Sequence, residues 1–470
     1  MKKFSTIALL TALLPAAGFA QTVPSDSEIE KALATRVDQQ HWATGIVVGI
    51  VTPQRTRTIA YGTTAKDGTQ KVGADTVYDI GSITKVFTAL ALADMAQHNE
   101  VALDDPVAKY LPKGTMLPKD GARQITLADL ATHTAGLPLR PDNLAPKDPD
   151  NKYAEYSEAD LYRFLAHAKP AHPIGSTYDY SNPSFGLLGV ALAHRAGTTY
   201  DALIEQCILK PLGMSDTLRS TTPQMRSRMA QGYSYDVAST DLTPAEHWDF
   251  GGGVAGAGGY RSTANDMMKF LQAVLGINPS PLAPAFSAMT KTRRPGGMMP
   301  ATAIALAWNI FDQDGHEIAW KNGSVGGFRA FIGYDATART GVVVLANAQT
   351  GTGGDDIGLH ILDPKLPVDL HIPRRHVETK IDAALLDRYV GTYKYADNDF
   401  VVVTRDGDHL AESENGQDKL ELFAEGERDF FFKAADAQIT FETERDGKVS
   451  AAIWHQDGQD QRGVLVPTAK

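Results

Sequence analysis

Two apolar segments near the start of the chain have the pattern of a β-hairpin. Residues 44–52 have the sequence TGIVVGIVT and residues 55–62 the sequence RTRTIAYG, with Pro53-Gln54 between them. Runs rich in β-branched and aromatic residues on both sides of a short proline-bearing turn are typical of two antiparallel strands. The pattern therefore predicts a hairpin over residues 44–62.

Strand patterns return only after a long helical region. Helical spacing of apolar residues dominates residues 82–212 and is interrupted by a segment rich in proline, 137–150. Strands are then predicted at 316–320, 329–334 and 341–346. The simplest interpretation is one sheet built from both ends of the domain. Consecutive hairpin-like strands favour an antiparallel sheet. The predicted fold class is α/β of the α+β type, with an antiparallel sheet flanked by helices and an inserted helical subdomain.

The last part of the chain has a different pattern. Residues 363–379 contain three prolines and few apolar pairs, which is typical of a linker. Five short β-rich runs follow, and Asp-Gly pairs, a strong hairpin signal, punctuate them at 406–407, 446–447 and 457–458. These runs are 400–404, 420–423, 430–433, 438–444 and 449–454. We therefore expect a main domain over 21–362, a linker over 363–382 and a small all-β barrel or sandwich over 383–470.

Composition excludes several classes of protein. The 470 residues include 45 basic and 56 acidic side chains, a formal net charge of −11, which disfavours binding to nucleic-acid phosphates. Cys207 is the only cysteine, so an intramolecular disulfide framework and a cysteine-ligated zinc site are excluded. The sequence contains no His-Glu-x-x-His metal motif, no phosphate-binding loop and no Gly-x-Ser-x-Gly elbow. We expect no metal and no cofactor.

The first twenty residues have the layout of a secretory signal peptide. Lys2 and Lys3 precede the apolar stretch 7–14, and small residues follow up to Ala20. The apolar stretch is far shorter than the roughly 20 residues that cross a bilayer. We expect cleavage after Ala20 and export, most simply to a bacterial periplasm, with no stable membrane anchor. A retained N-terminal anchor is the alternative.

The first candidate for chemistry is Ser82-Ile83-Thr84-Lys85. Apolar residues at helical spacing follow it, so Ser82 opens a buried helix and Lys85 projects from the same face. A serine hydroxyl becomes a good nucleophile when a neighbouring base takes its proton, and a lysine of lowered pKa can serve as that base. The alternative is an ordinary N-cap serine beside a solvated lysine.

Two further segments are ambiguous when taken alone. Tyr180-Ser181-Asn182 precedes an apolar run, and it offers a proton-shuttling phenol or simply a capped turn before a helix. Lys321-Asn322-Gly323-Ser324 enters a strand pattern, where a lysine could bind a carboxylate and a glycine could admit a substrate backbone. The alternative there is a glycine-bearing β-bulge.

Together, in the order Ser-x-x-Lys, Tyr-x-Asn and Lys-x-Gly, the three segments resemble the penicillin-recognising serine hydrolases. The resemblance is to the branch of class C β-lactamases and D-Ala-D-Ala carboxypeptidase/endopeptidases, and it covers about residues 44–347. It includes TLADLATHTAGLP at 126–138 and GGYRSTANDM at 258–267. In the second of these, Thr263 and Asp266 also predict an approximate capping box. The C-terminal part resembles the lipocalin-like β domains attached to some relatives.

The resemblance implies a role for each matching residue. Ser82 would be the acylated nucleophile, and Lys85 and Tyr180 would share the general-base and general-acid duties. Asn182 would hold the acyl-side amide of the substrate, and Lys321 its carboxylate. The backbone N–H groups of Ser82 and Ser324 would form the oxyanion hole, Ser324 being the residue that follows the Lys321-Asn322-Gly323 motif.

Two positions depart from the pattern of strong β-lactamases. Asn322 stands where those enzymes usually have threonine, and Arg140 stands where a glutamine commonly follows the Gly-Leu-Pro turn. Both changes alter recognition of the carboxylate and the amide, and Arg140 could favour an acidic peptide or point into solvent. His133 is expected to be structural, and the glycine run 251–259 is expected to pack near the active site.

The leading prediction is an exported, penicillin-binding DD-carboxypeptidase/endopeptidase that acts on D-Ala-containing cell-wall peptides through an acyl-enzyme. The first alternative keeps the site and changes the substrate, giving a class C-like β-lactamase or an esterase. The second is a sensor that is acylated slowly and does not turn over. Small molecules or peptides are the expected partners, and the sequence leaves the oligomeric state open.

Overall fold

The computed structural model describes residues 23–313, 315–396, 399–414, 419–433, 436–456 and 459–466. The signal peptide predicted at 1–20 and the Asp457-Gly458 turn lie outside these ranges. Within them, no helix is long and apolar enough to cross a membrane.

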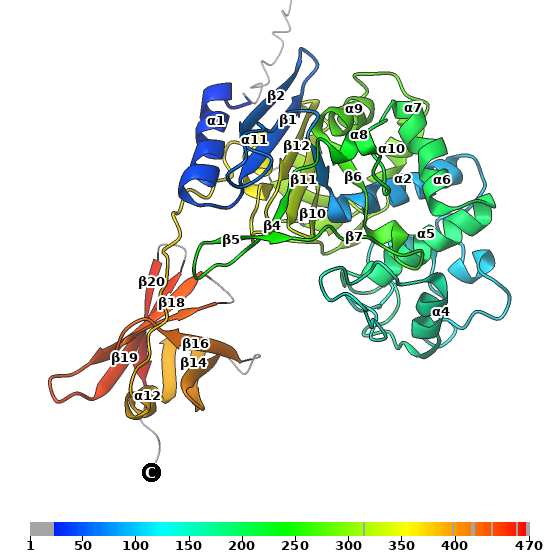
Figure 1. Cartoon of the computed structure of the whole chain (residues 1–470). Helices are drawn as coiled ribbons and strands as arrows, with labels where there is room; N and C mark the ends of the chain where they lie inside the picture. Colours follow the sequence, from blue (N-terminus) through cyan, green and yellow to red (C-terminus); the bar gives the residue numbers. More distant parts are fainter. Residues whose placement is uncertain are drawn as a thin grey trace, which may run out of the picture.

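The main domain is built on an antiparallel sheet that joins the two ends of the domain, as predicted (Figure 1). The order of its strands is β2-β1-β12-β11-β10-β9-β8-β7. Their bounds are β1 Gly45–Val51, β2 Thr56–Gly62, β7 Arg294–Pro295, β8 Ala303–Ile304, β9 Asn309–Gln313, β10 His316–Val325, β11 Phe328–Asp335 and β12 Thr340–Ala346. Ile46 of β1 pairs with Ala346 of β12, so strands about 300 residues apart in sequence are neighbours.

Helices cover both faces of the sheet, which explains why β1 is apolar at almost every position. Ile46 and Val48 pack into one core and Val47 and Val51 into the other. The first core contains residues of α1 (Asp26–Ala34) and α11 (Asp355–Leu362), and the second contains residues of α2 (Thr84–Gln97), α9 (Ala264–Val274) and α10 (Ala283–Met289). The π-helical turn η1 (Thr35–Gln39) continues α1.

The helical region forms a subdomain beside the sheet (Figure 1). Its elements are the short 3-10 turn η3 (Val107–Tyr110), α3 (Leu127–Ala131), α4 (Glu158–His167), α5 (Asn182–Ala196), α6 (Tyr200–Ile204), the π-helical turn η4 (Glu205–Leu209), α7 (Lys210–Leu212) and α8 (Pro223–Arg226). Two small sheets lie outside the main sheet: β3 (Val77–Asp79) pairs with β6 (Arg261–Thr263), and β4 (Gly232–Tyr235) pairs with β5 (Leu242–Ala245).

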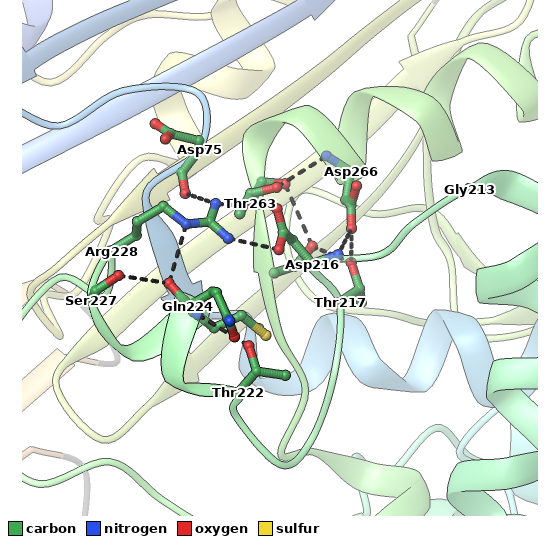
Figure 2. A network of polar contacts seen from close by, with 12 residues as sticks. Asp75, Gly213, Asp216, Thr217, Thr222, Gln224, Ser227, Arg228, Thr263 and Asp266 are labelled. Atoms are coloured by element: carbon green, nitrogen blue, oxygen red, sulfur yellow. Dashed lines mark hydrogen bonds and ion pairs between the residues drawn. The ribbon is translucent and has the colours of Figure 1, made fainter.

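A polar network holds β6 and the start of α9 in place (Figure 2). Thr263 Oγ1 accepts from the backbone N–H of Asp266, so Thr263 caps the helix as predicted. In place of the reciprocal half of a capping box, Asp266 Oδ2 accepts from the backbone N–H of Asp216 at 2.7 Å and from Thr217 Oγ1 at 2.9 Å. Arg228 donates to Asp216 and its backbone carbonyl accepts from Val77, so the network also fixes β3.

The C-terminal part is a closed barrel, which confirms the predicted small β domain. The short helix α12 (Ala383–Tyr389) precedes it, and the described strands run in sequence order around it, with β13 pairing with β20 to close the barrel. The strands are β13 Gly391–Ala396, β14 Asp399–Asp406, β15 His409–Glu414, β16 Leu420–Ala424, β17 Asp429–Phe432, β18 Ala437–Thr443, β19 Val449–Gln456 and β20 Gln459–Leu465. Aromatic residues such as Tyr393, Phe430 and Phe441 fill its core.

The segment between α11 and α12 is extended, and it contacts both domains. Gln40 Nε2 donates to the carbonyl oxygen of His371 at 2.6 Å, and the backbone N–H of His376 donates to Ala238 in the loop of the β4–β5 hairpin at 2.7 Å. The His376 ring stacks on Phe431 of the barrel and contacts Glu425 at 2.8 Å. Figure 1 shows this hairpin leaving the main domain and reaching the segment that leads into the barrel.

Candidate active site

Ser82 lies where strand β3 turns into helix α2. The 3-10 turn η2 (Gly81–Ile83) connects them, and Gly81 has a φ of +49°, in the left-handed region that favours glycine. A Cβ on Gly81 would lie 3.1 Å from the backbone nitrogen of Ser324. The Ser82 turn therefore packs backbone to backbone against β10, at the positive end of a helix.

Lys85 is completely buried one turn after the serine. Its Nζ lies 3.0 Å from Ser82 Oγ, 2.8 Å from Asn182 Oδ1 and 2.8 Å from the carbonyl oxygen of Ala257. Burial, together with the charge of Lys321, lowers the pKa of Lys85 well below its usual value. A neutral amine has two N–H groups and one lone pair. It can donate to the two carbonyl-type oxygens and point its lone pair at Ser82.

Tyr180 contacts the serine from the other side. Its hydroxyl donates to Ser82 Oγ at 2.6 Å, and its ring centroid lies 4.9 Å from Lys85 Nζ and 4.6 Å from Lys321 Nζ. Burial raises the pKa of Tyr180, so the phenol keeps its proton at neutral pH. Ser82 Oγ thus lies between a protonated acid and a neutral base.

The ring of His133 packs against the ring of Tyr180. The two ring centroids are 4.4 Å apart, and His133 Nδ1 accepts from the backbone N–H of Ser181 at 3.1 Å. Burial is the main cause that lowers the pKa of His133, and an accepting Nδ1 requires the neutral ring. These contacts support the structural role expected for His133.

Asn182 begins helix α5, for which Ser181 is the N-cap. Its Oδ1 accepts from Lys85, which directs its Nδ2 toward the hydroxyl of Tyr153 at 3.3 Å. The backbone N–H of Asn182 donates to the carbonyl oxygen of Leu139, in the turn that precedes Arg140.

Strand β10 brings the third segment to the same place. Lys321 is buried, and burial lowers its pKa to about 7, although the nearby Asp355 acts in the opposite direction. A Cβ on Gly323 would lie 2.1 Å from the carbonyl oxygen of Ile80 and 3.0 Å from the Ser82 nitrogen. Only a residue without a side chain fits there. The Ser82 and Ser324 amides are consequently held on adjoining segments.

The structure places two predicted substrate-binding side chains outside this cluster. Asn322 Nδ2 donates to Asp355 of α11 at 2.6 Å, on the face of β10 opposite to Lys321, and Arg329 also contacts Asp355. Arg140 is exposed and makes no side-chain hydrogen bond or ion pair with the described residues. Substrate recognition by these two residues stays a prediction.

Sequence reasoning missed two parts of the site. The Ala257 carbonyl that accepts from Lys85 belongs to the glycine run, whose expected packing near the site is confirmed: a Cβ on Gly256 would lie 2.3 Å from the carbonyl oxygen of Phe185. Tyr153 was missed because it lies in an irregular segment without periodicity. Its only sequence signal is an aromatic residue within a polar loop.

Among the described residues, no group of three or more His, Cys, Asp or Glu side chains is placed to hold a metal ion.

The chain is similar to known proteins over most of its length. The model of the family Beta-lactamase matches residues 29–363, and that of a domain of unknown function (DUF3471) matches residues 375–464. A β-lactamase of Pseudomonas fluorescens is 28% identical over 342 residues, which cover 66% of this chain and 90% of that protein. The D-alanyl-D-alanine-carboxypeptidase/endopeptidase AmpH of Escherichia coli K12 is 31% identical over 53% of this chain and 62% of its own length. The solved β-lactamase/D-alanine carboxypeptidase of Yersinia pestis has 26% identity and a TM-score of 0.62, covering 73% of this chain and 98% of that one.

Proposed function

Because this chain belongs to the Beta-lactamase family of serine hydrolases, we propose that it is an exported penicillin-binding DD-carboxypeptidase/endopeptidase that cleaves D-Ala-containing cell-wall peptides through an acyl-enzyme on Ser82. The observation that carries this proposal is the position of Ser82 Oγ, 3.0 Å from Lys85 Nζ and 2.6 Å from the Tyr180 hydroxyl. The signal peptide predicted at 1–20 supports export to the periplasm.

Lys85 is the base of the acylation step in this proposal. Its lowered pKa supplies a neutral amine, whereas the raised pKa of Tyr180 keeps the phenol protonated. Ser82 Oγ bonds to the substrate carbonyl carbon while its proton passes to Lys85. The bond to the leaving amine then breaks, and the amine takes a proton from Tyr180, which Lys85 restores. In deacylation, the oxygen of water bonds to the acyl carbon, the bond to Ser82 Oγ breaks, and the proton that water loses returns to Ser82 Oγ.

Backbone groups stabilise the charge that develops on the carbonyl oxygen. The N–H groups of Ser82 and Ser324 are the proposed donors, because the close packing of Gly81 and Gly323 holds their segments together. The N-terminus of α2 adds a partial positive charge at the same place.

Two side chains orient the substrate. Asn182 presents its Nδ2 to the acyl-side amide, since its Oδ1 is occupied by Lys85. The protonated form of Lys321 binds the terminal carboxylate of the substrate. The exposed Arg140 selects acidic peptides, and Asn322 acts indirectly through the strand that carries Lys321.

The separate hydrophobic cores support a division of the chain into two domains. We propose a hydrolase domain over 21–362, a linker over 363–382 and a barrel over 383–470.

Hydrolysis of β-lactams is the second candidate, favoured by the similarity to the Pseudomonas fluorescens β-lactamase. The two functions use the same acylation chemistry, and they differ in how fast water reaches the acyl-enzyme.

Intact-mass spectrometry of the mature protein with benzylpenicillin, sampled from seconds to hours, tests both functions. A persistent gain of one penicillin, absent in Ser82→Ala, is expected for the peptidase, together with release of D-Ala from a D-Ala-D-Ala peptide. A short-lived adduct with consumption of the drug would establish the β-lactamase instead. Ser324→Ala is the control, because it keeps the backbone N–H and should be acylated. An adduct that persists in Ser82→Ala, or none in the wild type with no peptide cleaved, would refute the proposal.

A further inference from the structure

The amide of Asn182 has a fixed orientation because it contacts two side chains. Lys85 Nζ, held by the Ala257 carbonyl, approaches its oxygen at 2.8 Å, and the Tyr153 hydroxyl lies 3.3 Å from its nitrogen. A rotated amide would turn its nitrogen toward Lys85 and its oxygen toward the phenol. Tyr153 therefore provides the second point of attachment, and one N–H of Asn182 stays available for a substrate.

Tyr153 is itself held rigidly. Its ring stacks on Phe250 with centroids 5.1 Å apart and an interplanar angle of 16°, and it meets Trp248 edge-on at 6.1 Å. The backbone N–H of Gly251 donates to the Tyr153 carbonyl at 2.8 Å. A Cβ on Gly251 would lie 2.4 Å from the Tyr156 carbonyl oxygen, so the two loops are in close backbone contact.

The loop that carries Trp248 and Phe250 is also anchored to the nucleophile strand. Asp249 accepts from Arg261 at 2.9 Å, and Arg261 donates to Asp79 of β3, three residues before Ser82. The Tyr153 hydroxyl is thus connected to the same framework that positions the serine. Because the Tyr153 hydroxyl is held rigidly, it fixes the direction in which the Asn182 side-chain amide points.

We propose that Tyr153 is a positioning residue that sets the preference of the enzyme for substrates with an amide on the acyl side of the scissile bond. It acts by holding the Asn182 nitrogen toward that amide, so the inference rests on the proposed function of Asn182 and Ser82. Peptides and penicillin-type molecules carry this amide, whereas a short-chain ester does not. Loss of the phenol should therefore affect the two substrate classes unequally.

The test compares Tyr153→Phe with Tyr156→Phe. The first keeps the stacked ring and removes only the hydroxyl. The second removes the Tyr156 hydroxyl, which belongs to the same loop and donates to Asn143 Oδ1 at 2.9 Å. For each protein, kcat/KM is measured with a D-Ala-D-Ala peptide and with p-nitrophenyl acetate. Tyr153→Phe should lower the peptide-to-ester ratio about tenfold, the value of one hydrogen bond, and Tyr156→Phe should leave the ratio unchanged.

A double-mutant cycle separates positioning from a general structural effect. In an Asn182→Ala background, Tyr153→Phe should change the ratio no further, because the group through which it acts is gone. Equal losses on both substrates, no loss on the peptide, or a full tenfold effect without Asn182 would overturn the inference. Failure of the proposed function is seen separately, as a wild type that forms no penicillin adduct and cleaves neither substrate.

Discussion

Substitution of Gly323 by alanine tests whether the catalytic geometry depends on backbone packing. The added Cβ would lie 2.1 Å from the carbonyl oxygen of Ile80, a distance that real Cβ atoms essentially never show, and 3.0 Å from the Ser82 nitrogen. Both neighbours are backbone atoms, so no flexible side chain can move aside. β10 and the Ser82 turn must separate by about 1 Å.

That separation acts directly on the two proposed oxyanion donors. A misplacement of about 1 Å costs on the order of 100-fold in rate, and loss of one oxyanion donor costs about 100- to 1,000-fold. We therefore expect the rate of acylation by benzylpenicillin to fall at least about 100-fold. Overpacking should also lower the free energy of unfolding by about 1–3 kcal/mol.

The assay is time-resolved intact-mass spectrometry, with circular dichroism to establish that the variant is folded. Gly252→Ala is the matched control, since a Cβ there would have no heavy atom within 4 Å. It should keep the wild-type rate. A folded Gly323→Ala protein that is acylated within about threefold of the wild-type rate would refute the argument that this contact sets the geometry of the site.

Three further predictions concern charge and the linker. Because the pKa of Lys321 is lowered to about 7, its ammonium form is present below pH 7 and lost above it. The kcat/KM for a peptide with a free carboxylate should therefore fall above pH 7, whereas the kcat/KM for a neutral ester should show no such decrease. Profiles of kcat/KM against pH for the two substrates test this. Arg140→Ala should leave the melting temperature unchanged, because the side chain is exposed, and should raise KM for acidic peptides only; a large loss of stability would contradict the exposed position. His376→Ala should lower the free energy of unfolding by about 1–3 kcal/mol without changing acylation, since it removes the stack on Phe431 and the contact with Glu425. Denaturant unfolding checks this, and unaltered stability would contradict a role in holding the barrel.

Local patterns were sufficient to predict the central strands of the sheet and the pairing of Ser82 with Lys85, whereas the short strands β7, β8 and β9 were not predicted. Strand β1 of the hairpin and the strands β11 and β12 are strongly apolar, because helices cover both faces of the sheet. Ser82 and Lys85 are one helical turn apart, so their proximity follows from local geometry. The addition of Tyr180 required the order of three segments, since its contact with Ser82 spans 98 positions.

Other features depend on tertiary contacts that no local pattern contains. The barrel strands β13, β15 and β20 were missed because their solvent-facing residues are polar, as in QDQRGVL of β20. The contact of Asn322 with Asp355 depends on which face of β10 each residue occupies and on the later helix α11. Tyr153 reaches Asn182 from a loop whose position is set by Phe250 and Trp248, about 100 residues further along.

The pairing of β1 with β12 has a consequence for the order in which the molecule folds. Strand β1 lies between β2 and β12, and its pairing with β12 cannot form until residues 340–346 are available, about 300 positions later. Long-range pairing of this kind is intrinsically slow, because the chain must lose the entropy of closing a very large loop. The barrel strands pair mainly with their neighbours in sequence. We therefore expect the barrel to reach its native structure first, although it is synthesised last, and the nucleophile turn to become ordered only as the two ends of the main sheet meet.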